Sequence, residues 1–353
     1  MKRFKSMAVA AFAILIAAAY MLPAVSVSAA SSAALSITPK KNYTIEPGKS
    51  VNDKLVIRNL DKDIPLQLTL RVVDFTFNDD GGTPKLMLAS DAPQTTWSLK
   101  PFLTVPESVT INPNSTKTLD ISVAIPKAHG AGSYYSAIVY SAGSGSSDSG
   151  NVGLSASGVT LVFTQIPGKV NENLKLENFG AYNLGTQNKK AEYTFITTAK
   201  PENMAYTLKN AGNVTEAPVG SITLKSMFGK EYVIDDVNPN KSLALIGQTR
   251  TFTSCIKLKT EEVDLNGQKT KSTQCTAPDL WPGLYTASLD IFYGQNGNNT
   301  EEIVSTAHFW YLPWWFILSV LIVLLAITYF VWRIVRRIKY GRPGPRTKAS
   351  RRR

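Results

Sequence analysis

A long stretch without charged side chains, from Phe309 to Trp332, constrains the fold more than any other feature of the sequence. Its 19 residues from Trp314 to Trp332 would form about 28 Å of helix, enough to cross the hydrocarbon core of a bilayer. Residues 333–353 then contain ten basic residues and no acidic residue, which the positive-inside rule places in the cytoplasm. The sequence therefore predicts a transmembrane helix over 309–332 and a basic cytoplasmic tail over 333–353.

Aromatic and basic side chains crowd both ends of this predicted helix, where amphipathic rings and cations favour the membrane–water interface. We expect the membrane-interface anchors to be Trp310, Trp314, Trp315, Trp332, Arg333, Arg336 and Arg337.

At the N-terminal end of the chain, the segments follow the order typical of a secretory signal peptide. Lys2, Arg3 and Lys5 precede an apolar run over 7–22, and small residues follow up to Ala30. The sequence predicts a signal peptide over 1–30, with a retained N-terminal anchor as the alternative. Together the two ends predict a single-pass type I protein in the cell membrane, with its domains outside the cell.

The overall charge is misleading as a sign of function. The chain has 38 Lys and Arg against 26 Asp and Glu, a net charge of +12, which would suit nucleic acid. However, 13 of the basic residues lie in 1–30 and 333–353, so 25 basic residues face 26 acidic ones between them. We therefore expect no nucleic-acid partner.

Between 31 and 308 the pattern is that of β-strands. Short alternating runs such as 50–59, 65–77, 117–125, 134–140 and 159–166 are separated by Pro, Gly, Asn and Asp. This spacing is typical of an all-β sandwich rather than of βαβ units.

An internal repeat indicates two such domains. An Asn-Pro-Asn triplet precedes a strand at 112–114 and again at 238–240, and a Gly-containing turn leads into an aromatic strand at 130–140 and at 281–293. The alternative is coincidence of common turn residues. We predict immunoglobulin-like domains over 31–168 and 169–308, and interpret the polar segment 141–153 as a loop between two strands rather than a linker.

Few residues could carry catalysis. His129 is the one ordinary candidate for a general base, and an exposed loop residue without a role is the simpler interpretation. The acidic clusters at 61–63 and 79–80 could bind calcium, but Asp-Asp-Gly-Gly over 79–82 is also an ordinary hairpin turn. We expect no catalytic residues, no metal and no cofactor, although paired carboxylates acting on a glycan stay open.

The two cysteines, Cys255 and Cys275, flank a polar segment with Asn266-Gly267 near its middle. In an oxidising exterior they predict a disulfide that joins the arms of a hairpin. Two buried free thiols are the alternative.

Several turn motifs carry a family resemblance. Ser36-Ile-Thr-Pro39, Ile45-Glu-Pro-Gly48, Ile111-Asn-Pro-Asn114 and the segment from Gly130 to Ile138 resemble the first domain of the WxL-interacting cell-surface proteins of Gram-positive bacteria. That family has a signal peptide, two immunoglobulin-like domains, one membrane helix and a basic tail. The resemblance implies peptidoglycan binding by the first domain and the holding of WxL-domain partners by the second.

The segment that best matches the family suggests a binding loop. It consists of Lys127, His129, Gly130, Gly132, Tyr134 and Tyr135. The chain departs from the family at Ser133 and Tyr134, where a pair of glycines is expected, and in having a cysteine pair.

The sequence as a whole predicts a non-enzymatic surface protein that presents two β-sandwich domains to peptidoglycan or to a secreted surface protein. One alternative is a chaperone-like assembly factor for surface proteins, and another is an enzyme or enzyme accessory that acts on cell-wall glycan. The ligand and the oligomeric state are left open.

Overall fold

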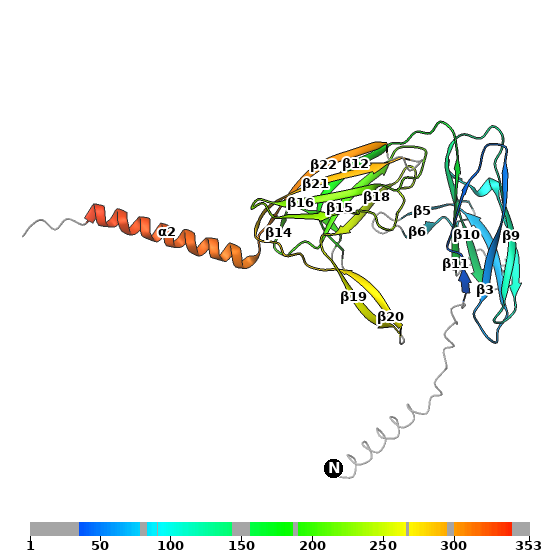
Figure 1. Ribbon diagram of the computed structural model, residues 1–353, viewed down its shortest axis with the longest axis horizontal. Coiled ribbons are helices and arrows are strands. Elements are labelled where there is room, and N and C mark those ends of the chain that lie inside the picture. The colour runs from blue at the N-terminus through cyan, green and yellow to red at the C-terminus, as the bar shows by residue number, and fades with distance from the viewer. Residues whose placement is uncertain are drawn as a thin grey trace, which may run out of the picture.

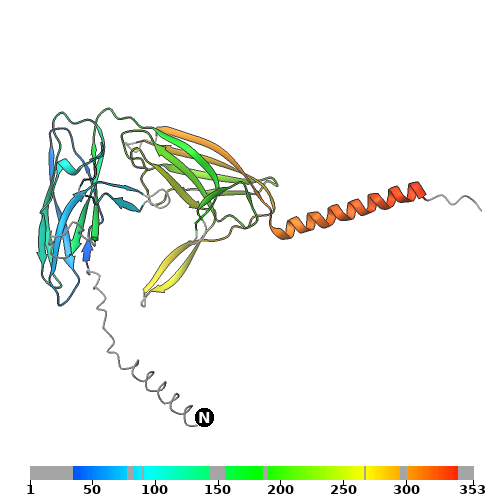
Figure 2. The same ribbon diagram turned by 180° about the vertical axis from the view of Figure 1, so that it is seen from behind.

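A computed structural model describes residues 35–77, 83–89, 91–142, 156–185, 190–265, 268–294 and 300–340. These residues form two immunoglobulin-like β-sandwiches in tandem, followed by one long helix that leaves the second sandwich on the side away from the first (Figures 1 and 2). The predicted fold class is confirmed. The predicted signal peptide and the tail beyond Tyr340 lie outside the described residues.

The first sandwich consists of a four-stranded sheet, β1-β3-β9-β7, and a five-stranded sheet, β2-β11-β10-β4-β8. Its strands are β1 (Leu35–Ile37), β2 (Lys40–Thr44), β3 (Ser50–Asn59), β4 (Leu66–Val73), β7 (Leu103–Thr104), β8 (Ser108–Ile111), β9 (Thr116–Ala124), β10 (Gly132–Ala142) and β11 (Ala156–Ile166), with a small hairpin of β5 (Phe75–Phe77) and β6 (Pro84–Leu86) and a 3-10 turn η1 (Lys100–Phe102). β10 pairs with β11 in an antiparallel arrangement. The segment 141–153, predicted to be a loop, lies outside the described residues from 143 onward.

The second sandwich has the sheets β13-β12-β15-β18 and β14-β22-β21-β16-β17. Its strands are β12 (Leu174–Asn183), β13 (Glu192–Thr194), β14 (Ile196–Thr197), β15 (Asn203–Asn210), β16 (Val219–Ser226), β17 (Glu231–Ile234), β18 (Thr249–Cys255), β21 (Gly283–Tyr293) and β22 (Glu301–Tyr311); β19 (Leu258–Leu265) and β20 (Gln268–Cys275) form a separate hairpin.

The predicted repeat is present in the strand order. In each five-stranded sheet a short edge strand, β2 or β14, pairs in parallel with the last strand of its sandwich, β11 or β22.

A buried asparagine occupies the same place in both copies. The side-chain amide of Asn59 donates to the carbonyls of Ile64 and Ile111, and that of Asn210 donates to those of Val214 and Ala244.

A tyrosine corner is also repeated, which explains the aromatic residues that follow the Gly-containing turns. Gly132 and Gly283 open the equivalent strands with φ of 146° and 148°. Two residues later, the Tyr134 hydroxyl donates to the Gly130 carbonyl at 3.2 Å, and the Tyr285 hydroxyl donates to the Trp281 carbonyl at 2.8 Å.

The segment 65–77 differs from the single strand expected there. It divides at Asp74 into β4 and β5. The buried Asp74 carboxylate accepts hydrogen bonds from the hydroxyls of Thr95, Ser98 and Ser136, and these contacts hold the chain as it leaves the sheet. Residues 78–82, which include the acidic pair considered for calcium, lie outside the described residues.

The helix begins later than the hydropathy pattern suggests. Helix α2 spans Trp314–Tyr340, whereas Phe309 is buried in β22 and stacks on Tyr285 with ring centroids 5.3 Å apart. Trp310, expected at the membrane interface, likewise lies in β22, and Pro313 separates strand from helix. Hydropathy alone places the boundary too early because both a buried strand and a membrane helix are apolar.

By length and composition α2 could cross a membrane. None of its residues is buried against other described parts of the chain. Of the residues expected to be membrane-interface anchors, Trp314 and Trp315 lie in its first turn, and Trp332, Arg333, Arg336 and Arg337 lie in its second half.

Candidate functional site: the cleft between the sandwiches

The two sandwiches share a hydrophobic cluster. Val73, Phe75, Tyr135 and Phe163 of the first sandwich pack with Leu245 of the second. The ring of Tyr135 is fully buried and lies 5.2 Å from that of Phe75. The apolar contact therefore joins the two domains directly.

The hairpin β5–β6 adds a second contact and points toward the second sandwich (Figure 1). The Phe77 N–H donates to the Gln248 side-chain carbonyl at 3.0 Å. The guanidinium of Arg250 lies 5.1 Å from the centre of the Phe77 ring and donates to the Leu243 carbonyl.

Two of the six residues of the predicted binding loop, Gly132 and Tyr135, belong to this interface. The Ser133 N–H donates to the Asn213 carbonyl at 3.0 Å, and the Asn213 amide donates to the Ala131 carbonyl at 3.1 Å. A Cβ at Gly132 would lie 2.7 Å from that same Asn213 oxygen. Gly132 and Tyr135 are thus buried where the domains meet.

The other four predicted residues, Lys127, His129, Gly130 and Tyr134, lie closer to the surface. His129 lies between the rings of Phe102 and Tyr134, with centroids 4.6 and 4.5 Å away, and burial lowers its pKa. Lys127 is exposed and packs on Gly48, where a Cβ would meet its side chain, and Gly130 is exposed. The role of these residues as a binding loop stays a prediction.

Beside the shared cluster lies a cleft of about 500 Å³. Both sandwiches line it, with Lys40, Asn42, Tyr43, Thr44, Ser133, Phe163, Thr164 and Gln165 on one side and Thr215, Glu216, Ala217, Val219, Lys241, Leu243 and Gly294 on the other. Sequence reasoning missed this site, because its walls come from segments as far apart along the chain as Lys40 and Gly294.

One rim of the cleft is an edge strand. β2 pairs with β11 along one side, from Lys40 opposite Leu161 to Thr44 opposite Gln165, and no other strand of the described residues pairs with its second side. Lys40, Asn42 and Thr44 are the exposed residues of β2. An unpaired edge of this kind offers main-chain donors and acceptors to an added strand.

The opposite face of β2 is held in place by charge. The Lys41 ammonium lies 2.8 Å from the Asp53 carboxylate, and the Tyr43 hydroxyl donates to the same carboxylate at 2.7 Å. These hydrogen bonds lower the pKa of Asp53 to about 2. β2 is therefore tied to Asp53 of the other sheet through Lys41 and Tyr43, while its exposed residues Lys40, Asn42 and Thr44 line the cleft.

Cations and one buried acid set the electrostatics of the cleft. Lys40 lies 4.8 Å from the centre of the Phe163 ring, and burial lowers its pKa. Lys241 lines the cleft from the second sandwich. Glu216 is 2% exposed, and one of its carboxylate oxygens has no hydrogen-bond partner among the described residues. Burial and the nearby charge of Glu172 raise the pKa of Glu216 to about 7.

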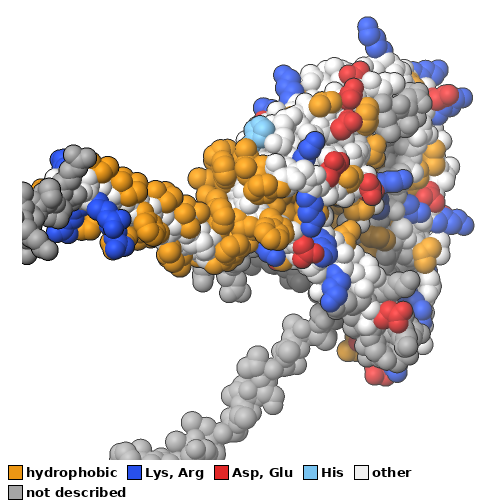
Figure 3. Space-filling model, turned by 60° about the vertical axis from the view of Figure 1, so that its left-hand side comes forward, with side chains coloured by type: hydrophobic (Ala, Val, Ile, Leu, Met, Phe, Trp, Pro, Cys, Tyr) orange, Lys and Arg blue, Asp and Glu red, His pale blue; other side chains and the backbone are white. Residues whose placement is uncertain are grey.

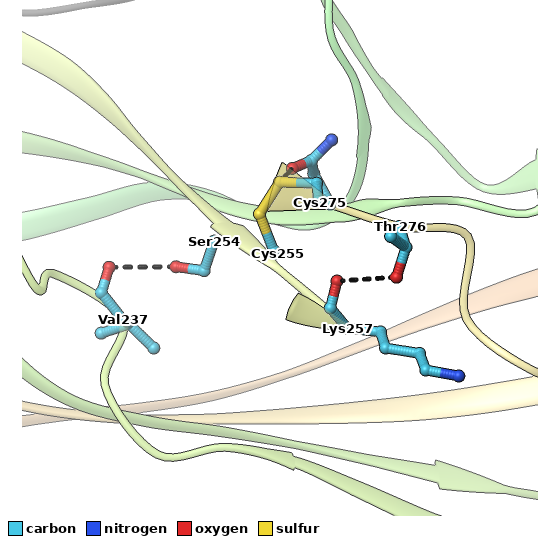
Figure 4. The surroundings of a disulfide bond; sticks show 7 residues. Val237, Ser254, Cys255, Lys257, Cys275 and Thr276 are labelled. Carbon is cyan, nitrogen blue, oxygen red and sulfur yellow. Dashed lines mark hydrogen bonds between the residues drawn. A yellow bond between two sulfur atoms is a disulfide. The ribbon is translucent and has the colours of Figure 1, made fainter. Parts of the chain in front are cut away.

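The predicted disulfide is present. Cys255 ends β18 and Cys275 ends β20, with Cα atoms 5.4 Å apart. Beside it, the Ser254 hydroxyl donates to the Val237 carbonyl and the Thr276 hydroxyl donates to the Lys257 carbonyl (Figure 4). It closes the base of the β19–β20 hairpin, whose expected Asn-Gly tip lies outside the described residues.

Within the described ranges no group of three or more His, Cys, Asp or Glu residues could hold a metal ion. Asp61, considered for calcium, accepts hydrogen bonds from the N–H groups of Asp63 and Ile64 and so shapes its own turn.

Comparison with known proteins gives structural likeness only. No family model matches the sequence, and no curated protein matches it. A chain of a chaperone–tip adhesin complex of CFA/I fimbriae biogenesis is 10% identical with a TM-score of 0.36, over 79% of this chain and 99% of that chain. The Escherichia coli chaperone DraB is 13% identical with a TM-score of 0.31, over 79% and 97%. A Salmonella enterica SafA pilin–SafB chaperone structure is 8% identical with a TM-score of 0.29, over 78% and 95%.

Proposed function

We propose that this protein is a non-enzymatic binding protein, anchored in a membrane by α2, that holds an extended segment of a secreted protein in the cleft between its sandwiches. The open edge of β2 at the cleft carries this proposal. A segment added there would gain affinity from main-chain hydrogen bonds and specificity from alternate side chains.

The charges of the cleft favour a particular partner segment. Lys40 and Lys241 approach from opposite walls, whereas Glu216 holds its proton up to about pH 7. Cations therefore dominate the cleft below that pH, and they suit a segment with carboxylate side chains.

A photo-crosslinking amino acid at Thr44 of the full chain, in the cells that produce it, tests the proposal. Thr44 should form adducts with a secreted protein, and Lys241→Glu should reduce them several-fold. The matched controls on the other sheet are the same amino acid at Asp120 and Lys117→Glu. Equal adducts at Thr44 and Asp120 would contradict binding in the cleft.

A chaperone-like role in the assembly of surface proteins would use the same open edge, and the two roles differ in the lifetime of the complex. An adduct formed only with newly made protein would support assembly; one formed with old and new protein alike would support permanent holding. Binding of peptidoglycan, implied by the family resemblance, stays a prediction; incubating the full chain with isolated cell walls and assaying retention tests it.

A further inference from the structure

Exposed apolar side chains gather at the end of the second sandwich from which α2 leaves. Phe195, Phe228 and Trp281 are 61%, 72% and 69% exposed, and Ile196 and Met227 are exposed beside them. We name these five residues the basal patch. Figure 3 shows hydrophobic side chains gathered over this sandwich where the helix joins it, with charged side chains above them and to their right.

Strand register shows that the patch is continuous. Ile196 pairs with Trp310 and Trp310 pairs with Leu284, while the Met227 N–H donates to the Leu284 carbonyl. A row of neighbouring residues, Ile196, Trp310, Leu284 and Met227, therefore crosses the sheet from β14 to the turn after β16. Phe228 and Trp281 line a shared hollow at the same end.

The connection to α2 keeps this row close to the helix. β22 ends at Tyr311 and α2 begins at Trp314, so Trp310 is four residues from the first helical residue, at most about 14 Å along the chain. If Trp314 lies at the headgroup level, as its exposed ring favours, the basal patch reaches the same layer.

Cations border the patch. The Lys257 ammonium lies 2.8 Å from the Asp279 carboxylate, two residues before Trp281. Lys200 and Lys230 also lower the pKa of Asp279 by their positive charge. Lys257, Lys200 and Lys230 thus lie near one carboxylate beside the patch, and ammonium groups of this kind attract anionic lipid headgroups.

From these contacts we infer that the basal patch is a membrane-contact surface that inserts at the interface of a lipid bilayer. This contact fixes the orientation of the sandwiches relative to the membrane. A bilayer is the partner because the short connection leaves no room for a folded protein between patch and headgroups. The inference rests on the proposed anchoring by α2. Rings that insert by about 5 to 10 Å would add contact area beside the helix.

Lipid-dependent quenching on the full chain tests this surface. The single variant Phe228→Cys carries an environment-sensitive fluorophore, while the Cys255–Cys275 disulfide leaves no other thiol to label. The protein is reconstituted in phosphatidylcholine–phosphatidylglycerol vesicles that contain lipids with a quencher at the headgroup or in the acyl chain. Leu60→Cys, exposed on the first sandwich, is the matched control, and Ile322→Cys within α2 reports anchoring. Trp281→Cys repeats the test if Phe228→Cys loses its β-sheet circular dichroism.

We expect headgroup-level quenching of the Phe228 label several-fold above that of the Leu60 label, and acyl-chain quenching of the Ile322 label. A Phe228 label that is quenched no more than the Leu60 label, with Ile322 still quenched, overturns the contact surface but leaves the anchoring intact. Blue-shifted Phe228 emission without lipid quenching would mean that protein covers the patch and would also overturn the inference. Loss of quenching at Ile322 would instead overturn the anchoring itself.

Discussion

Gly132 shows how a residue expected to bind a ligand instead joins two domains. Its φ of 146° lies in a region that favours glycine, and a Cβ would press on the Asn213 carbonyl at 2.7 Å. The neighbouring Ser133 hydroxyl accepts a hydrogen bond from the Thr215 N–H. Contact between the sandwiches therefore explains the residue types at Gly132 and Ser133.

Glu216 predicts a pH dependence of stability. Its ordinary pKa of 4.5 is raised to about 7 in the folded protein, so between these values the unfolded chain ionises while the folded chain keeps the proton. The folded state loses stability across that window, and the deficit persists above it. Glu216→Gln should therefore increase the free energy of unfolding by up to about 3 kcal/mol at about pH 8 and change it little at about pH 4.

Urea unfolding of the full chain in detergent at the two pH values measures this effect. Glu231→Gln, an exposed glutamate on β17, is the control and should show similar, small effects at both. If Glu216→Gln increased the free energy of unfolding as much at about pH 4 as at about pH 8, ionisation of Glu216 would not be the cause.

At the scale of elements, the β19–β20 hairpin depends on its closure. It is a two-stranded sheet that pairs with no other sheet of the described residues, and isolated hairpins are marginal in water. The disulfide compensates by joining the end of β18 to the end of β20 across a separation of 20 residues.

Replacing both cysteines, Cys255→Ser with Cys275→Ser, should lower the free energy of unfolding of the second sandwich by about 3 kcal/mol, because the unfolded chain regains the entropy of the closed loop. Denaturant unfolding of the full chain, monitored by circular dichroism, measures the loss. In the unaltered, non-reduced protein neither cysteine should react with an alkylating reagent. Ready alkylation of both in the folded state would contradict the bond.

At the scale of the whole molecule, we expect the shared cluster to couple the unfolding of the two sandwiches. Leu245 is 1% exposed and packs with Phe75 and Tyr135 of the other sandwich. Leu245→Ala should lower the free energy of unfolding by roughly 2–5 kcal/mol. Because it weakens the contact between the domains, it should also split one thermal transition into two. Calorimetry of the full chain detects the split. Val304→Ala, an exposed position on β22, should leave a single transition, and two transitions in the unaltered protein would contradict the coupling.

Local patterns were sufficient for the elements that depend on neighbours along the chain. The strand 50–59 was predicted with its boundaries, because Val51, Leu55 and Ile57 alternate with polar residues. The Cys255–Cys275 pairing needed only two cysteines and a polar segment between them. Where two environments are equally apolar, as at Phe309, the same patterns placed the boundary wrongly.

What the sequence determined by itself is a chain of two repeated all-β sandwiches with an apolar C-terminal helix, since side-chain alternation, turn residues and hydropathy act over short distances. Only the tertiary structure decided that the turn at Gly132 lies between domains, that β2 presents an open edge to a cleft, and that Phe195, Phe228 and Trp281 form one patch beside α2. These features bring together residues far apart in sequence, and their contacts arise only when both sheets of each sandwich close on their cores.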